Sequence, residues 1–247
     1  PHTWRANTQV LLPPLQAFAS RKGWSFMTIP TKDRKPIEIV LDLKSHRAGG
    51  ILLGSSRPEL VKAVQKSGIP AVLIEDWIRD VDMDSVMQDG QLGGQLAVQY
   101  LAEKGCRRMA WFGPASPGTH NFDRFSGVVA ALAELGLPLD PGLTARSDSP
   151  HDNLAARALL ERADRPDGIV AMWTGHAAAL VRAGTALGLR EGRNFHLVGW
   201  TPEEDFDSVY RAAFEGAPVP PSITWTARVL AETAMGRAGV SKSPTDE

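Results

Sequence analysis

Short apolar runs alternate along the chain with longer segments of mixed character. Each run has the length of a strand that is buried on both faces of a sheet, and none reaches the length of a core helix. Runs of this kind are typical of parallel sheets, whose two faces are both covered by helices. The runs lie at Ser25–Ile29, Gly50–Leu53, Ala71–Ile74, Met109–Phe112, Gly168–Met172 and Phe195–Gly199.

Between these runs, apolar residues recur at spacings of three and four, which predicts amphipathic helices. Leu92, Leu96 and Tyr100 form one such series, and Phe125, Val128, Leu132 and Leu135, Leu154 to Leu159, and Leu180 to Leu187 form others. Gly136 and Gly188 stand where glycine usually ends a helix. Strands that alternate with helices predict an α/β protein built from doubly wound parallel sheets with right-handed crossovers.

Two segments rich in proline and glycine are candidate connections between lobes. The first runs from Gly113 to Gly118, and the second runs from Gly216 to Pro221. They predict an N-terminal lobe of residues 1–113 plus about 222–247, and a C-terminal lobe of residues 114–221.

Composition narrows the class of protein. The 247 residues carry a net charge of −1, whereas a chain that binds nucleic acid by itself usually has a basic excess. No apolar run approaches the roughly 20 residues that a membrane helix needs. The single cysteine, Cys106, fits a reducing compartment, which favours the cytoplasm. No signal peptide is recognisable, and the chain, which starts at Pro1, is expected to be part of a longer protein.

Known catalytic and cofactor motifs are missing from the sequence. There is no phosphate-binding loop, no dinucleotide-binding glycine fingerprint and no nucleophile elbow. The six histidines are scattered, without a pair spaced for a metal on one helix face. We therefore expect a protein that is not an enzyme, with no metal and no cofactor.

Tryptophan is the most informative residue type, because the chain has 7 tryptophans and only 2 tyrosines. Trp77, Trp173 and Trp200 each follow or end a predicted strand, and Trp4 is expected in a loop before the first helix. Ligands of open parallel sheets bind outside the carboxyl ends of the strands. These four side chains are therefore candidates for stacking on a sugar ring or another amphipathic ligand, and packing at lobe edges is the alternative. Trp24 and Trp111, within or beside strands, are expected in the core.

Several motifs, in this order and spacing, resemble the effector-binding region of lactose-repressor (LacI/GalR) family transcriptional regulators. Gly68–Glu75 resembles the family's G-I-P-V-V-x-I-D strand, and Asp84–Gly94 is similar to its V-x-x-D-N-x-x-G-G helix entry. The remaining matches are Ala48–Ser55, Arg124–Gly127 with Ala130–Leu132, Gly136–Pro141, Pro166–Ala171, His196–Trp200 and Pro221–Thr224. The similarity runs from about residue 1 to about residue 236 and extends to periplasmic sugar-binding proteins.

The resemblance implies a periplasmic-binding-protein-like type I fold, with a small ligand held between two lobes. The family's arginine in R-x-x-G-F, here Arg124, donates hydrogen bonds to the effector, and Asp89 matches an aspartate that suits both a ligand contact and a helix cap. The expected binding residues are Trp4, Asn7, Trp77, Gln88, Asp89, Arg124, Trp173, Thr174, Trp200 and Thr201.

The resemblance also implies partners. A homodimer would control operator DNA through a headpiece, and no helix-turn-helix of this kind is recognisable before Pro1. A secreted solute-binding protein that feeds a transporter is the alternative reading, and an enzyme on a similar fold is a third.

The chain departs from the family pattern at two strand ends. Trp173 and Thr174 stand where the family usually has Asn-Asp, and Thr201 stands where it usually has Asp. The site is therefore expected to be more aromatic and less acidic. An aromatic, anionic or deoxy-sugar ligand, or a site that no longer binds a ligand, stays open.

Overall fold

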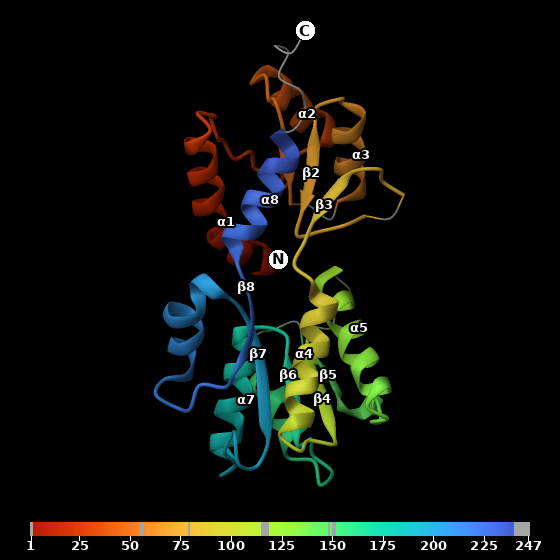
Figure 1. The fold of residues 1–247 in the computed structure, drawn as a ribbon, viewed down its shortest axis with the longest axis vertical. Helices are drawn as coiled ribbons and strands as arrows, with labels where there is room; N and C mark the ends of the chain where they lie inside the picture. The colour runs from red at the N-terminus through yellow and green to blue at the C-terminus, as the bar shows by residue number, and fades with distance from the viewer. Residues whose placement is uncertain are drawn as a thin grey trace. The chain divides into compact units, whose positions relative to one another are not determined.

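The computed structural model describes residues 2–54, 57–78, 80–114, 119–147, 149 and 152–239, without the side chains of residues 2–8, 119, 120, 146 and 239. The chain divides into two compact units (Figure 1). Unit 1 contains residues 1–88 and 226–247, and unit 2 contains residues 89–225. Unit 2 is therefore continuous in sequence, whereas both ends of the chain belong to unit 1.

Unit 1 has a parallel three-stranded sheet in the order β1-β2-β3. Helices α2 and α3 cover one face, where Ile39, Leu43, Leu60 and Val64 pack against Ile51 and other strand residues. Helix α8 contacts all three strands and pairs with α1 (Figure 1). The elements are α1 (His2–Arg21), α2 (Pro36–Ser45), β1 (Ile51–Leu53), α3 (Pro58–Lys66), β2 (Ala71–Ile74), β3 (Asp84–Val86) and α8 (Ala227–Gly239).

Unit 2 has a parallel five-stranded sheet in the order β5-β4-β6-β7-β8. Its helices are α4 (Gly90–Glu103), α5 (Thr119–Glu134), α6 (Asn153–Leu160) and α7 (Thr174–Ala186). Its strands are β4 (Met109–Gly113), β5 (Thr144–Arg146), β6 (Gly168–Ala171), β7 (His196–Pro202) and β8 (Ser222–Trp225). The short helical turns are η1 (Pro141–Leu143), η2 (Glu203–Asp205), η3 (Phe206–Tyr210) and η4 (Arg211–Phe214).

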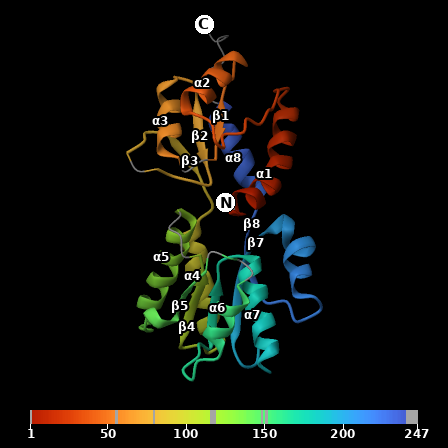
Figure 2. The same cartoon turned by 180° about the vertical axis from the view of Figure 1, so that it is seen from behind.

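The two faces of the unit 2 sheet are covered by different helices, as the predicted doubly wound arrangement requires. Along β4, Met109 and Trp111 join the core beneath α4 and α5, whereas Ala110 and Phe112 join the core beneath α6 and α7. This alternation follows from the two-residue period of a strand. Figure 1 shows α4 and α5 beside each other, and Figure 2 shows α6 and α7 from behind. The expected α/β class with parallel sheets is confirmed.

The sequence misplaced the first connection between the units. The chain enters unit 2 between Gln88 and Asp89, not in the segment from Gly113 to Gly118. Helix α4 belongs to unit 2 because Ala97, Val98 and Leu101 are buried against strands β4 and β6 of that unit. The proline- and glycine-rich segment follows β4 and precedes α5, and residues 115–118 lie outside the described residues.

The predicted strand at Ser25–Ile29 is wrong, because these residues form no ladder with a described strand. Met27 is 48% exposed, so the run is not buried on two faces as a central strand would be. The expectation that Trp24 is in the core fails with it, since this side chain is 41% exposed and packs on Phe18. Trp111 is buried as expected.

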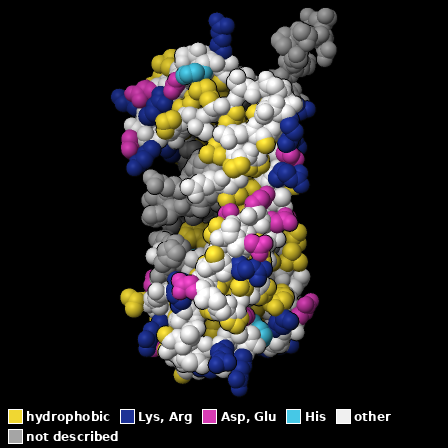
Figure 3. All heavy atoms as spheres, turned by 90° about the vertical axis from the view of Figure 1, so that its left-hand side faces the viewer, with side chains coloured by type: hydrophobic (Ala, Val, Ile, Leu, Met, Phe, Trp, Pro, Cys, Tyr) yellow, Lys and Arg dark blue, Asp and Glu magenta, His cyan; other side chains and the backbone are white. Residues whose placement is uncertain are grey.

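Figure 3 shows cationic and anionic side chains interspersed over the face that it presents, without a broad patch of one sign among the described residues. Within the described part of the chain, no helix has the length and hydropathy needed to cross a bilayer.

Candidate ligand-binding site

Arg124 lies on α5 and is almost completely buried, with 4% of its surface exposed. Its Nη1 donates a hydrogen bond to the carbonyl oxygen of Met172, 3.1 Å away, just after the end of β6. Its guanidinium carbon lies 4.0 Å from the ring centroid of Trp200, over the ring face. The arginine expected to contact the ligand is therefore held in one orientation at the carboxyl edge of the unit 2 sheet.

Trp200 lies on β7 and is also only 4% exposed, because α4 approaches it at a glycine. A Cβ atom at Gly93 would overlap Cη2 of the indole and would lie 2.7 Å from Cζ2. The same missing atom would lie 3.2 Å from Cγ2 of Ile223 on β8. Trp200 thus fills a notch between α4, β8 and Arg124, and its ring is not an open platform.

Trp173 differs from Trp200, because it is only partly buried. It immediately precedes α7, and its ring stacks on His176, with centroids 5.1 Å apart and planes at 14°. His176 is fully buried, packs edge-on against Phe112, and has Nε2 3.2 Å from the carbonyl oxygen of Ser147. The stack holds the Trp173 ring in place at the end of β6. Thr174 begins α7 and is partly buried.

Asp89 and Thr201 are the other polar candidates in unit 2. One carboxylate oxygen of Asp89 accepts a hydrogen bond from the backbone N–H of Leu92 at 2.8 Å, so Asp89 is the N-cap of α4. The expected capping role is confirmed, and its ligand contact stays a prediction. Thr201 is only 2% exposed, and its hydroxyl has no hydrogen-bond partner among the described residues.

Unit 1 places its own candidates just after β2 and β3. Trp77 is 40% exposed. Gln88 donates to Glu75 twice, from its side-chain amide at 2.7 Å and from its backbone N–H at 3.2 Å. Glu75 is buried and has a φ of 59°, an uncommon left-handed conformation for a residue with a side chain. Such conformations persist only where the surrounding structure fixes them, and they concentrate at functional sites.

The remaining two candidates lie on α1. Trp4 was expected in a loop before the first helix, but it falls within α1 (His2–Arg21). The loop expectation is therefore wrong. The side chains of Trp4 and Asn7 lie outside the described residues.

The sequence did not single out three residues that shape these sites. Glu75 directly follows a buried strand, which is the same signal that selected the tryptophans, but it was interpreted only as part of a family motif. Gly93 likewise lies in a family motif, the glycine pair of the helix entry, whereas His176 carries no comparable signal because its partners are distant in the sequence. The structure thus groups Arg124, Trp200 and Trp173 in unit 2, and Gln88 with Glu75 in unit 1.

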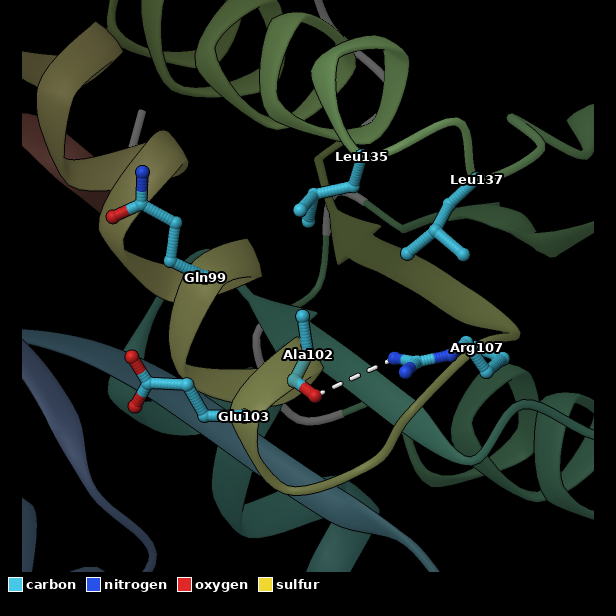
Figure 4. A pocket seen from close by; sticks show the side chains of 6 residues that line it. All are labelled: Gln99, Ala102, Glu103, Arg107, Leu135 and Leu137. Carbon is cyan, nitrogen blue, oxygen red and sulfur yellow. Dashed lines mark hydrogen bonds between the residues drawn. The ribbon is translucent and has the colours of Figure 1, made fainter.

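A pocket of about 430 Å³ lies elsewhere in unit 2 and contains none of the predicted residues. Figure 4 shows Gln99, Ala102 and Glu103 on α4, with Leu135 and Leu137 opposite. Arg107 closes one side, and its Nη1 donates to the carbonyl oxygen of Ala102 at 3.4 Å. Because this contact caps the end of α4, we interpret Arg107 as a structural residue.

Burial shifts the pKa of two groups in unit 2, Cys106 and Tyr210. Burial raises the pKa of the Cys106 thiol to about 11, so the thiol is protonated and unreactive near neutral pH. Burial also raises the pKa of the Tyr210 phenol. No group of three or more metal-binding side chains occurs among the described residues.

The chain forms two α/β units, each with a parallel sheet, and it passes from unit 1 into unit 2 and back again. This organisation is that of a periplasmic-binding-protein-like domain. A family model described as "Periplasmic binding proteins and sugar binding domain of LacI family" matches residues 9–196. The chain belongs to this family, which confirms the resemblance seen in the motifs.

Curated relatives are transcriptional regulators by name. The HTH-type transcriptional regulator CelR of Thermobifida fusca is 28% identical over 165 residues, covering 63% of this chain and 47% of the relative. The ribose operon repressor of Escherichia coli (strain K12) is 34% identical over 122 residues, covering 48% of this chain and 36% of the relative. The chain thus spans about half of these proteins or less.

The fold also matches solved structures. A regulatory protein of the LacI family from Chloroflexus aggregans superposes with a TM-score of 0.82 and 22% sequence identity, over 93% of this chain and 82% of the other. At this identity the match supports the fold.

Proposed function

We propose that this chain is the effector-binding domain of a bacterial transcriptional regulator, and that a small sugar-like ligand binds at the carboxyl edge of the unit 2 sheet. The observation that supports this most directly is that Arg124 donates to the carbonyl oxygen of Met172, and the next residue, Trp173, has a partly exposed ring. A guanidinium offers several donors in a fixed fork, which suits the hydroxyl oxygens of a sugar. An indole face suits the apolar face of a sugar ring.

The names of the relatives support a regulatory role rather than an enzymatic one. The matched proteins are a regulator and an operon repressor, and the family model includes sugar-binding domains. The protein would act in the cytoplasm as a homodimer, because operator half-sites are usually read by symmetric dimers. DNA contact would come from a headpiece that these 247 residues do not include, and ligand binding would shift the dimer between two conformations.

Trp77 and Gln88 in unit 1 are separate candidates. Trp77 presents an exposed indole, and Gln88 is held by Glu75. We propose that both assist ligand binding, and variants at these positions test unit 1 independently of Arg124.

A thermal-shift screen tests the proposal. The purified domain would be heated with D-ribose, D-glucose, cellobiose, a deoxy-sugar, a sugar acid and an aromatic metabolite, each at increasing concentration. A ligand that binds only the folded state raises the melting temperature as its concentration increases. At a ligand concentration of 100 times Kd, the free energy of unfolding increases by about 2.7 kcal/mol. We expect at least one sugar to give such a shift. A flat response to every sugar would contradict the proposal.

A further inference from the structure

Trp200 contacts two different elements of unit 2 through its indole ring. Its indole ring touches α4 at Gly93 on one side and the guanidinium of Arg124 on the other. Arg124 then reaches Met172 at the end of β6 through its hydrogen bond. Four elements, α4, β7, α5 and β6, thus meet in one chain of contacts, and both central side chains are almost fully buried.

We propose that Trp200 is a positioning residue that fixes the guanidinium of Arg124 for ligand binding, and does not itself stack on the ligand. The part that concerns ligand binding rests on the function proposed above. The indole also occupies the space beside β7, so that the ligand is recognised through Arg124 and Trp173.

The attraction between these two side chains has a clear physical basis. A cation over the face of tryptophan is attracted by the ring quadrupole, and the effect grows when both groups are removed from water. A guanidinium held over the ring face has less freedom to reorient, so its N–H groups point in more defined directions. The hydrogen bond to Met172 then fixes the rotation within that plane. An arginine ordered in this way loses less conformational entropy when a ligand binds.

Gly93 makes this arrangement possible. Any side chain at this position would place a Cβ atom in steric overlap with the indole ring, so Trp200 and Gly93 must be considered as a pair. Gly93→Ala should displace the ring and release Arg124. Combining Gly93→Ala with Trp200→Leu should relieve the overlap, because the leucine is smaller, without restoring the stacked guanidinium.

NMR of the arginine Nε–H groups tests the positioning role without any ligand. The ring current of Trp200 should shift the Arg124 resonance upfield from those of the exposed arginines, and Arg124→Met identifies the peak by removing it. Trp200→Leu and Gly93→Ala should move this resonance toward the others. Trp24→Leu, a matched change in unit 1, should leave it in place. A wild-type resonance without an upfield shift, or one that Trp200→Leu leaves in place in a folded protein, would overturn the proposal.

Calorimetry with a sugar that binds the wild type provides the second readout. Trp200→Leu should weaken binding roughly tenfold, because the ligand would then have to order the Arg124 side chain when it binds. In an Arg124→Met background the same substitution should cause no further loss, because the residue that it positions is gone. Equal losses in both backgrounds would show that Trp200 contacts the ligand directly. If no sugar binds the wild type, the proposed function fails, whereas the NMR result still decides the positioning role.

Discussion

The role of a residue in this domain depends on its burial as much as on its chemical type. Trp200 lies within β7 and Trp173 follows β6, yet the first is buried under Arg124 and the second is partly exposed on His176. Both positions can be selected from the sequence, because a tryptophan after a predicted buried strand is expected at the carboxyl edge of the sheet. The sequence could not separate their roles, because the difference depends on Gly93, which lies on another element.

The burial of Cys106 predicts how the stability of the protein depends on pH. Its pKa is raised to about 11 by burial, whereas the unfolded thiol titrates near 9.0. Since the folded state favours the neutral thiol, this contribution to stability is fully present below pH 9 and is lost as the pH rises toward 11. Urea denaturation should show a decrease in stability over this range that is smaller in Cys106→Ala.

Alkylation provides the control for this prediction. Iodoacetamide at pH 8 should modify Cys106 slowly in the native protein and rapidly in urea, because the thiolate is the reactive form. Rapid modification of the native protein would contradict the burial of this thiol.

At the scale of elements, the pattern of apolar residues predicted most strands of unit 2 because they are buried on both faces. The predicted runs at Met109, Gly168 and Phe195 correspond to β4, β6 and β7. Three-residue strands such as β3 and β5 carry no such signal, since Asp84–Val86 and Thr144–Arg146 are short and partly polar. Ser25–Ile29 has the pattern of a strand without a ladder partner among the described residues, and pairing is not encoded in the run itself.

The backbones of helices α4 and α5 approach each other closely at two glycines. A Cβ at Gly94 would overlap the carbonyl oxygen of Arg124, and one at Gly127 would overlap the carbonyl oxygen of Gln91. Because these neighbours are backbone atoms, Gly94→Ala must separate the helices, and we expect it to reduce the free energy of unfolding by about 3 kcal/mol or more. Chemical denaturation measures this change.

Gly236→Ala is the matched control, because this glycine is also helical and a Cβ there would meet nothing within 4 Å. Alanine is favoured over glycine in a helix by about 1 kcal/mol, so this variant should be as stable as the wild type or more stable. Similar destabilisation of both variants would show that helix packing at Gly94 is not the cause.

The start of α6 depends on Asp152. Its carboxylate accepts the backbone N–H of Ala155 at 3.0 Å and the Ser147 hydroxyl at 2.7 Å. These bonds, the backbone one first, hold the pKa of Asp152 below its usual value of 3.8. The stabilisation is therefore present above about pH 4 and is lost as the pH falls through the lowered pKa.

Asp152→Ala should reduce stability at pH 7 by about 1 kcal/mol, the usual cost of losing an N-cap. The difference from the wild type should shrink below pH 4, when the wild-type carboxylate is also protonated. Asp207→Ala, which removes an exposed carboxylate paired with Arg211, should change stability by only a few tenths of a kcal/mol, roughly. An undiminished difference at low pH would contradict the capping role.

At the scale of the whole molecule, the chain crosses between the units immediately before two helices. Asp89, the first residue of unit 2, caps α4, and the carbonyl oxygen of Thr226 accepts from Leu230 at the start of α8. The sequence placed the first crossing at proline and glycine residues because such residues usually mark connections. The crossing at Gln88 has no such composition, and only the packing of α4 shows which unit the helix joins.

The central claim is that Arg124 and Trp173 bind a small sugar-like ligand. Calorimetry tests it most directly, with the sugar that gives the largest thermal shift titrated into the wild type, Arg124→Lys, Trp173→Leu and Trp24→Leu. Lysine keeps the charge but loses the planar fork, so this variant distinguishes recognition from simple attraction. We predict binding that is weakened about tenfold or more in the first two variants and unchanged in Trp24→Leu. Wild-type affinity in both Arg124→Lys and Trp173→Leu would contradict the account.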